Sequence, residues 1–346
     1  MLVALLGDTH FGASKASPII SAHFKKFYQY FFEYLDKNEI TTIIQTGDMF
    51  DQRKDVHFST IKWVNENFFT PIKAYDIKLY VIAGNHDCQY KNTNEINSVS
   101  LLCPRGTTVV DQFPMTVVLD DTKIDLYPWV NESNHIVTLA LAKTSKSKFA
   151  VGHFEFSGFP MHPGTIAETG MSHSLFANYE QVFSGHYHTV SQKDNILYTG
   201  TPCELTWSDY GDSKGFWVLD TETGKREFIA NPYTLFEKIS YVEGMSYDFT
   251  KVKEKFVKII VVSKTDQKKF DKFVDNVNIN QPHDLKIIES VIVGTVSDAV
   301  DITALVDTHT MINSVVDNIV TTLDKIRLGQ YVRELHAEAT IINNTI

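Results

Sequence analysis

Short apolar or β-branched runs alternate with stretches of helical spacing along the first part of the chain. Runs of strand length lie at Leu2 to Leu6, Thr41 to Ile44 and Leu79 to Ala83. Between them, apolar residues recur at the spacing of a helix face from Pro18 to about Lys37 and from Phe58 to Phe68. This alternation predicts parallel strands joined by crossover helices, and therefore an α/β fold.

Beyond Asn92 the pattern becomes mixed. A short helix is predicted near Asn97 to Leu102, a hairpin turn at Asp120-Asp121 and a helix from Asn134 to Lys143. The segment from Glu155 to Asn178 contains glycines and prolines, and we predict a surface loop there. The remaining strands of this region are predicted at Met115 to Leu119, Lys123 to Tyr127, Phe149 to Val151, Val182 to Phe183, Ile196 to Thr199, Phe216 to Leu219 and Lys225 to Ile229.

Three regions follow from these patterns. A first domain spans residues 1–231, with a boundary near Asn231-Pro232. Residues 232–297 form a small βαβ-like domain, with strands at Val257 to Val262 and Leu285 to Val293 flanking a helix at Gln267 to Val277. Residues 298–346 are a helical tail with one apolar stripe, which could pack on its own domain or bind a partner.

Polar residues of similar chemistry follow five of the predicted strands, each time directly after a glycine. Because ligands bind at the carboxyl ends of strands in open α/β sheets, we expect these side chains to converge on one cluster. The glycines allow the backbone to bend sharply at each strand end. The residues are Asp8 and His10; Asp48; Asn85, His86 and Asp87; His153; and His186 and His188.

Composition narrows the class of protein. The 346 residues include 43% hydrophobic residues, enough for a large domain and a smaller one. No apolar run reaches membrane-spanning length, and the three scattered cysteines favour reduced thiols and a cytoplasmic setting. The net charge of −10 is unfavourable for gripping nucleic acid unaided. Either the substrate is small, or metals and a partner supply positive charge.

The cluster offers nitrogen and oxygen ligands without thiolate. This mixture suits manganese, iron or zinc, and the number of residues is enough for two ions. Two metals about 3.5–4 Å apart can hold a bridging hydroxide and two phosphate oxygens, which is the recurrent arrangement for in-line hydrolysis of phosphate esters. The residues therefore predict a dinuclear metal-dependent phosphoesterase.

In this order, the motifs resemble those of the calcineurin-like metallophosphoesterases. More narrowly, the chain is similar to the nuclease subunit of the double-strand-break repair complex, in its bacterial SbcD-type and tailed-phage recombination endonuclease forms. The matching stretches are Gly47-Asp48-Met49-Phe50-Asp51, Gly152-His153 with Glu155, Ser184-Gly185-His186-Tyr187-His188-Thr189, Gly200-Thr201-Pro202 and Gly215-Phe216-Trp217.

The resemblance implies roles for the clustered residues. His86 is implied to be the general acid and Asp48 to bridge two metals. It implies two divalent cations, with manganese expected and magnesium, iron or zinc possible. The implied ligands are Asp8, His10 and His188 for one ion, and Asn85, His153 and His186 for the other.

The resemblance also implies an architecture and partners. The expected fold is a two-layer mixed β-sandwich flanked by helices, with residues 1–231 as the nuclease domain and 232–297 as a capping, DNA-binding domain. A homodimer would form through Phe58 to Phe68 and Asn97 to Leu102, and a coiled-coil ABC-type ATPase would bind the tail. The implied activity is manganese-dependent DNA exonuclease or endonuclease cleavage, in the host cytoplasm if a phage encodes the chain.

One position departs from the cellular relatives. These usually carry a histidine where Asp51 stands, and a Pro-Ser pair where Lys54 and Asp55 follow Arg53. The local sequence is instead similar to the G-D-x-x-D of protein phosphatases. We therefore predict a catalytic pair between the Asp51 carboxylate and His86, with a solvated loop aspartate or a helix cap as the alternative.

Two other functions remain compatible with the same residues. One is a stand-alone phosphodiesterase or phosphatase acting on nucleotides or phosphoproteins. The other is a non-catalytic scaffold whose metals are structural and which tethers DNA ends.

Overall fold

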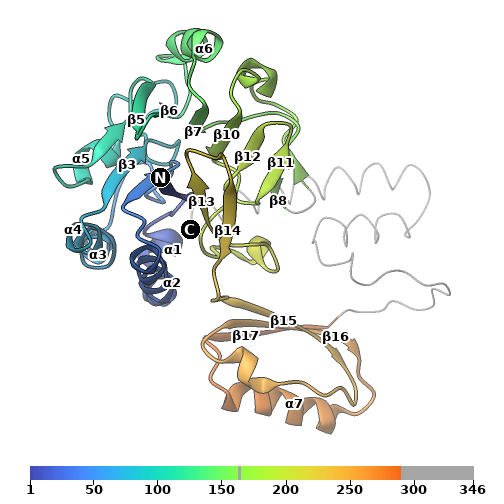
Figure 1. Ribbon diagram of the computed structural model, residues 1–346. Coiled ribbons are helices and arrows are strands. Elements are labelled where there is room, and N and C mark those ends of the chain that lie inside the picture. The colour runs from blue at the N-terminus through green and yellow to red at the C-terminus, as the bar shows by residue number, and fades with distance from the viewer. Residues whose placement is uncertain (163–164, 290–346) are drawn as a thin grey trace, which may run out of the picture. The chain divides into compact units, whose positions relative to one another are not determined.

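Two mixed sheets stacked face to face form the centre of the computed structural model, which describes residues 1–162 and 165–289 (Figure 1). The first sheet has the order β14-β13-β1-β2-β3-β4. In it, β1 to β4 run parallel, and β13 is antiparallel to both of its neighbours. The strands are β1 (Leu2–Leu6), β2 (Thr42–Gln45), β3 (Lys78–Ile82), β4 (Thr108–Val110), β13 (Gly215–Asp220) and β14 (Arg226–Ala230).

The second sheet has the order β11-β12-β10-β7-β6-β5. Its four central strands are parallel, and an antiparallel strand closes each edge. The predicted hairpin at Asp120-Asp121 is the β5–β6 connection. The strands are β5 (Met115–Leu119), β6 (Thr122–Tyr127), β7 (Phe149–His153), β10 (Gln181–Gly185), β11 (Ser191–Lys193) and β12 (Ile196–Tyr198).

Apolar side chains from both sheets fill the space between them. Leu5 and Ile82 of the first sheet are fully buried in one cluster with Val151 and Phe183 of the second. Burial of each such side chain stabilises the fold by about 1.5–3 kcal/mol. The arrangement confirms the predicted two-layer mixed β-sandwich.

Helices cover the outer face of the first sheet (Figure 1). The long helix α2 begins at a proline in its first turn and buries one aromatic stripe, in which Phe31 meets Phe216 of β13 at 4.7 Å between ring centroids. The helices before residue 150 are α1 (Ala13–Ala16), α2 (Pro18–Lys37), α3 (Phe58–Val64), the π-helix η1 (Asn65–Phe69), α4 (Thr70–Ala74), α5 (Ser98–Leu102) and α6 (His135–Thr144).

An aromatic cluster covers the outer face of the second sheet, and two of its rings, Phe156 and Phe176, come from the segment predicted to be a surface loop, which begins at Glu155. Phe154, Phe156 and Phe176 are fully buried there, with ring centroids 4.7–5.4 Å apart. The segment also contains the short strands β8 (Pro160–His162) and β9 (Thr165–Ile166) and the 3₁₀ helix η2 (His173–Phe176). The surface-loop prediction is therefore only partly correct: most described residues of the segment are exposed or half-buried, but Phe156 and Phe176 are buried in the outer core of the second layer.

A third, parallel sheet of order β15-β16-β17 follows in sequence. The predicted strand–helix–strand order is confirmed by β16 (Phe256–Ser263), α7 (Gln267–Ile279) and β17 (Asp284–Glu289), whereas β15 (Phe236–Val242) was not predicted. A 3₁₀ helix, η4 (Phe249–Val252), lies between β15 and β16. The domain boundary at residue 231 stays a prediction. The tail 298–346 and the end of the strand predicted to reach Val293 lie outside the described residues.

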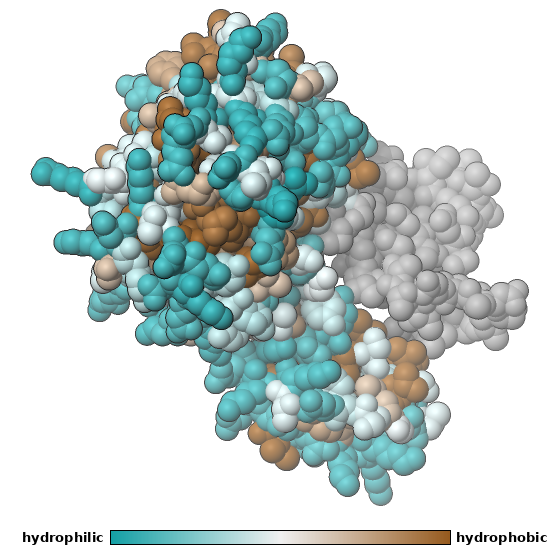
Figure 2. Space-filling model, viewed as in Figure 1, coloured by the Kyte–Doolittle hydropathy of each residue, from teal (hydrophilic) through white to brown (hydrophobic). Residues whose placement is uncertain are grey.

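Hydrophilic side chains dominate the face of the molecule shown in Figure 2, with apolar side chains gathered in patches between them. Large exposed apolar side chains include Phe58 and Leu101, on α3 and α5, and Ile136 on α6. Within the described ranges, we find no helix with the length and apolar character that a membrane span requires.

Candidate metal centre

Five strand ends bring the predicted polar residues together. Strands β1, β2 and β3 are neighbours in the first sheet, and β7 and β10 are neighbours in the second. The strands within each set run parallel, and Oδ1 of Asn85, after β3, lies 2.9 Å from Nε2 of His153 at the end of β7, so the carboxyl ends of both sets meet at one site. The sequence prediction of a single convergent cluster is therefore met by the geometry.

Asp8, His10 and His188 form one group of possible metal ligands. One ligand atom from each lies within 4.8 Å of the others. The Nε2 atoms of His10 and His188 are only 3.1 Å apart, and Asp8 and His10 are almost fully buried. Three donors at this spacing can share one ion.

Asp48, His153 and His186 form a second such group. Asn85 joins it, because its Oδ1 atom lies 2.9 Å from Nε2 of His153 and 2.8 Å from Nδ1 of His186. Oδ2 of Asp48 lies 3.4 Å from Nε2 of His153 and 3.9 Å from Nε2 of His10 in the first group. The Asp48 carboxylate therefore stands between the two groups, where a bridging ligand is needed.

The donor chemistry fits divalent cations. Oδ1 of Asp8 is a buried carboxylate oxygen that accepts no hydrogen bond from the described residues. Buried acceptors of this kind are rarely left unsatisfied, and a cation is one of the few partners that satisfies a carboxylate fully. With imidazole nitrogens and carboxylate and amide oxygens, the set suits manganese, iron or zinc.

Close packing explains two of the glycines before the ligands. A Cβ atom on Gly84 would lie 2.2 Å from the Asp48 backbone nitrogen, and one on Gly185 would lie 2.4 Å from Oδ1 of Asp8. Gly47 alone of the five preceding glycines has the positive φ (115°) that the predicted sharp bend requires. The glycine pattern thus reflects close approach of strands to ligands more than backbone flexibility.

Three of the proposed ligands have left-handed backbone conformations. The φ angles are 42° at His10, 50° at Asp48 and 89° at His186. Such values are uncommon outside glycine and cost of order 1–3 kcal/mol each, so they persist where the surroundings hold them and concentrate at functional sites.

Asp87 secures the loops that carry Asp48 and His86. Its carboxylate accepts hydrogen bonds from the backbone N–H groups of Met49, Phe50 and Gly84 at 2.9–3.1 Å. Burial, followed by the nearby Asp48 carboxylate, raises the pKa of Asp87 to about 6. The sequence placed Asp87 in the cluster without a role, and its role in the structure is to join two ligand loops.

The predicted pair between the Asp51 carboxylate and His86 requires correction. Nδ1 of His86 lies 2.7 Å from the backbone carbonyl oxygen of Asp51, whereas Oδ1 of Asp51 lies 3.4 Å from Nδ1 of His10. Burial raises the pKa of Asp51, but the bond to His10 outweighs it and lowers that pKa overall. The side chain of Asp51 therefore contacts the proposed metal ligand His10, and its backbone carbonyl contacts the proposed acid His86.

His86 is further held through its own backbone. Its N–H donates to Oδ1 of Asp48 at 2.7 Å, and its ring stands edge-on to the His10 ring at 5.0 Å between centroids. The proposed acid thus lies directly beside the carboxylate that stands between the two ligand groups.

Lys214 was not indicated by any sequence motif. Its buried ammonium group donates to the backbone carbonyl of His188 at 3.0 Å and pairs with Asp209 at 2.8 Å and Asp212 at 3.0 Å. A lysine in a loop carries no signal of burial, so only the fold could identify it. The contact holds the backbone of His188, a proposed metal ligand, without using its ring.

Two histidines carry raised pKa values that oppose metal binding at neutral pH. Burial lowers the pKa of His10, but neighbouring carboxylates, Asp51 first, outweigh it and raise that pKa to about 9. Burial likewise lowers the pKa of His153, and the carboxylates of Asp48 and Asp8 raise it to about 9. With only the charges of the protein around them, the imidazole rings of His10 and His153 are therefore protonated at pH 7.

We expect metal binding at pH 7 to release protons, because imidazole coordinates only in its neutral form. Raised pKa values mean that protons compete below about pH 9, so apparent affinity for Mn²⁺ should increase from pH 6.5 to pH 9. Calorimetric titrations in buffers of different ionisation enthalpy would measure the protons released. Heats that are equal in all buffers, with affinity independent of pH, would contradict the expectation.

Comparisons with known proteins show which family this chain is similar to. Residues 1–190 match the family model described as calcineurin-like phosphoesterase. The chain is 34% identical to exonuclease subunit 1 of Enterobacteria phage T4 over 345 residues, covering 98% of this chain and 100% of that protein. A solved structure described as GAP50, the anchor in the inner membrane complex of Plasmodium, is 12% identical, with a TM-score of 0.39, covering 68% of this chain and 90% of that one.

Proposed function

The chain belongs to the calcineurin-like phosphoesterase family, and from this premise we propose that it is a divalent-metal-dependent DNA nuclease acting as one subunit of a complex. The observation that carries the proposal is the convergence of two ligand groups on the Asp48 carboxylate. The name of the phage T4 relative, an exonuclease subunit, supports a nucleic acid as the substrate and a further subunit as partner. A cytoplasmic location is part of the same proposal.

The proposed ligands divide between two cations, with manganese as the expected metal. Asp8, His10 and His188 would hold one, and Asn85, His153 and His186 the other, with Asp48 shared. When bound, two such cations neutralise phosphate charge and activate water for in-line attack on phosphorus.

His86 is the proposed general acid for the leaving oxygen. A carbonyl oxygen can only accept a hydrogen bond, so the contact with Asp51 fixes the proton of His86 on Nδ1. Nε2 is then the nitrogen that can present a proton to the leaving group once the ring is cationic.

A cleavage assay with three substrates tests the proposed function. Linear duplex DNA, circular single-stranded DNA and bis-nitrophenyl phosphate would be incubated with the chain and Mn²⁺. We expect cleavage of DNA and of the small ester, and loss of both on chelation. Turnover of the small ester alone would favour a stand-alone phosphodiesterase, and metal-dependent DNA binding without any cleavage would favour a tethering scaffold.

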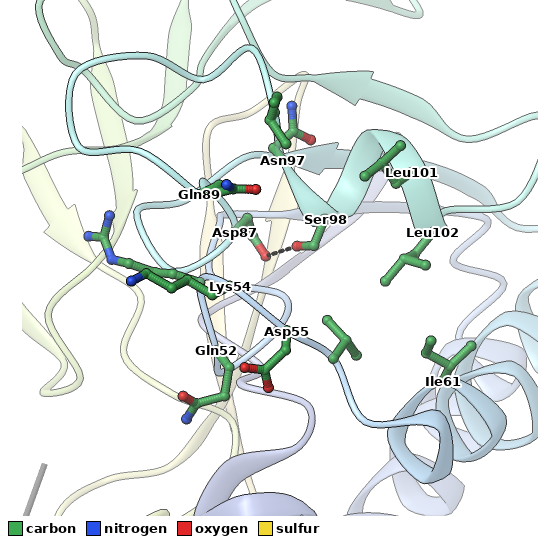
Figure 3. Close-up of a pocket in the computed structure, with 13 residues that line it drawn as sticks. Gln52, Lys54, Asp55, Ile61, Asp87, Gln89, Asn97, Ser98, Leu101 and Leu102 are labelled. Carbon is green, nitrogen blue, oxygen red and sulfur yellow. Dashed lines mark hydrogen bonds between the residues drawn. The ribbon is translucent and has the colours of Figure 1, made fainter. Parts of the chain in front are cut away.

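A second copy of the chain is the proposed partner at α3 and α5. A surface cleft of about 230 Å³ lies between these helices, and Figure 3 shows Ile61 and Leu102 on its facing sides. Leu101, which lines the cleft, is 73% exposed, and Phe58, the first residue of α3, is 90% exposed. Large apolar side chains in such a patch favour burial against another protein surface.

The coiled-coil ATPase is the partner proposed for the tail, which lies outside the described residues.

Leu101→Glu is expected to shift the chain from dimer to monomer, because a carboxylate would be buried against apolar side chains. Light scattering after size exclusion would measure the change in mass. Ile136→Glu is the matched control, since Ile136 on α6 is equally exposed, at 74%, outside the cleft. A dimer that survives the first substitution, or dissociates equally with both, would contradict the assignment.

A further inference from the structure

Three lysines stand side by side across the small third sheet. Lys238 of β15 pairs in register with Lys258 of β16, and Lys258 pairs with Lys286 of β17. Side chains at paired positions of neighbouring strands point to the same face, about 4.8 Å apart at the backbone. The opposite face packs on α7, where Ile239 and Ile259 are buried. We call these three residues the lysine row.

The lysine row is electrostatically unfavourable within the protein alone. Like charges directly opposite one another destabilise a sheet. Among the described residues, none of the three lysines forms an ion pair, although other lysines of this region do, such as Lys255 with Glu237. Burial, followed by the Lys238 and Lys286 ammonium groups, lowers the pKa of Lys258. In a chain of net charge −10, this concentration of positive charge is a local feature.

Aromatic rings from a neighbouring loop hold two of the three side chains in place. Nζ of Lys258 lies 4.0 Å from the ring centroid of Trp207, and Nζ of Lys238 lies 4.8 Å from that of Tyr210. Trp207 begins the 3₁₀ helix η3 (Trp207–Asp209), between β12 and β13. These contacts orient the ammonium groups and reduce the entropy lost when they bind an anion.

We propose that the lysine row binds the phosphate backbone of the DNA substrate. The inference rests on the proposed function and specifies which surface of this chain contacts its substrate. A single protein carboxylate could neutralise only one lysine, whereas a nucleic-acid strand presents phosphates in series to the whole row. Lys258 and Lys238 each lie over one face of the Trp207 and Tyr210 rings, and Trp207 also packs on Phe236, so both rings are engaged within the protein. The contact is therefore independent of sequence and positions the strand.

The test compares two triple variants of the full chain with equal changes in charge. The first replaces Lys238, Lys258 and Lys286 with glutamine. The second replaces Lys251, Lys268 and Lys272, which are exposed residues of the same region outside the row. Binding to a short duplex would be measured by fluorescence anisotropy with chelator present, so that no cleavage occurs, from about 50 to 200 mM salt. Thermal denaturation without DNA would check that each variant folds.

The row variant is expected to bind more weakly and to lose about 2–3 from the slope of log affinity against log salt, close to one for each phosphate contact. Its thermal stability should stay near that of the wild type, because removal of like-charge repulsion offsets loss of the contacts with Trp207 and Tyr210. The control variant should keep a slope near that of the wild type, and arginine at all three row positions should restore it. Equal losses in both triple variants, or an unchanged slope in the row variant, would overturn the proposal.

The outcomes separate this inference from the proposed function. If the wild type cleaves DNA with Mn²⁺ but the row variant keeps the salt slope of DNA affinity, the proposed function stands and this inference is wrong. If the chain binds DNA through the lysine row but cleaves none under any condition, this inference stands and the proposed function is wrong. If the row variant keeps its DNA slope and fails to bind its partner subunit, the row is a protein interface and the proposal is wrong.

Discussion

Replacing Asp48 with asparagine is expected to lower kcat on DNA by roughly a thousandfold or more and to reduce the number of metal ions bound per chain. Loss of one charge-stabilising group commonly costs 10²–10³ in kcat, and this carboxylate faces both ligand groups. Asparagine retains an oxygen that can accept from the His86 N–H, so the main-chain contact at 2.7 Å survives while the charge is removed.

The measurements are metal content by elemental analysis and turnover under saturating Mn²⁺. Asp121→Asn is the matched control, because Asp121 is an exposed carboxylate in the β5–β6 turn and should affect neither quantity. Two metals retained per chain with normal turnover in Asp48→Asn would show that Asp48 is not a shared ligand.

His86→Gln is expected to lower kcat on DNA by roughly 10²–10⁴, the usual contribution of a positioned general acid. The loss should be much smaller on bis-nitrophenyl phosphate, since nitrophenolate leaves without a proton. Metal content should stay at the wild-type value, because His86 is not among the proposed ligands. Equal losses on both substrates would show that His86 acts on something other than the leaving group.

The structure predicts a different result for Asp51. Asp51→Asn leaves the backbone carbonyl that holds Nδ1 of His86, so protonation of the leaving group should survive. It removes the negative charge beside His10. Above about pH 9, where protons no longer compete for that ring, a change of this kind behind a metal ligand should weaken metal affinity by roughly 10–100-fold. Losses on the two substrates should therefore be equal and should be restored by excess Mn²⁺. A selective loss on DNA would reinstate the carboxylate–imidazole pair.

The ligand cluster could be predicted because strand ends in parallel sheets have a defined location. Asp8, Asp48 and Asn85 each follow a strand with a clear apolar run, and the glycine before each carries its own signal. Strand β15 could not be predicted in the same way, because Lys238 and Ser240 interrupt its apolar residues on the side away from α7. The sequence of β15 is apolar mainly on the one face that packs on α7.

Side-chain direction was beyond what the sequence could show. The sequence around Asp51 is compatible with a contact to His86 from either the side-chain carboxylate or the backbone carbonyl of Asp51. Only the path of the backbone after Asp48 decides between them. Phe156 and Phe176 lie in the segment predicted to be a surface loop, because its glycines and prolines indicate irregular structure. Burial of their rings depends on tertiary packing, which the local sequence does not show. Lys214 belongs to the same class, since its partners are distant in sequence or brought close by a turn.

The position of β13 has a consequence for how the chain matures during synthesis. Every proposed ligand lies between residues 8 and 188, yet β1, which leads to Asp8 and His10, pairs on one side with β13 from residues 215–220. Until the ribosome has released β13, β1 is an exposed edge, and His188 lacks its contact with Lys214. A nascent or prematurely terminated chain therefore carries the complete set of proposed ligands without a rigid frame for them.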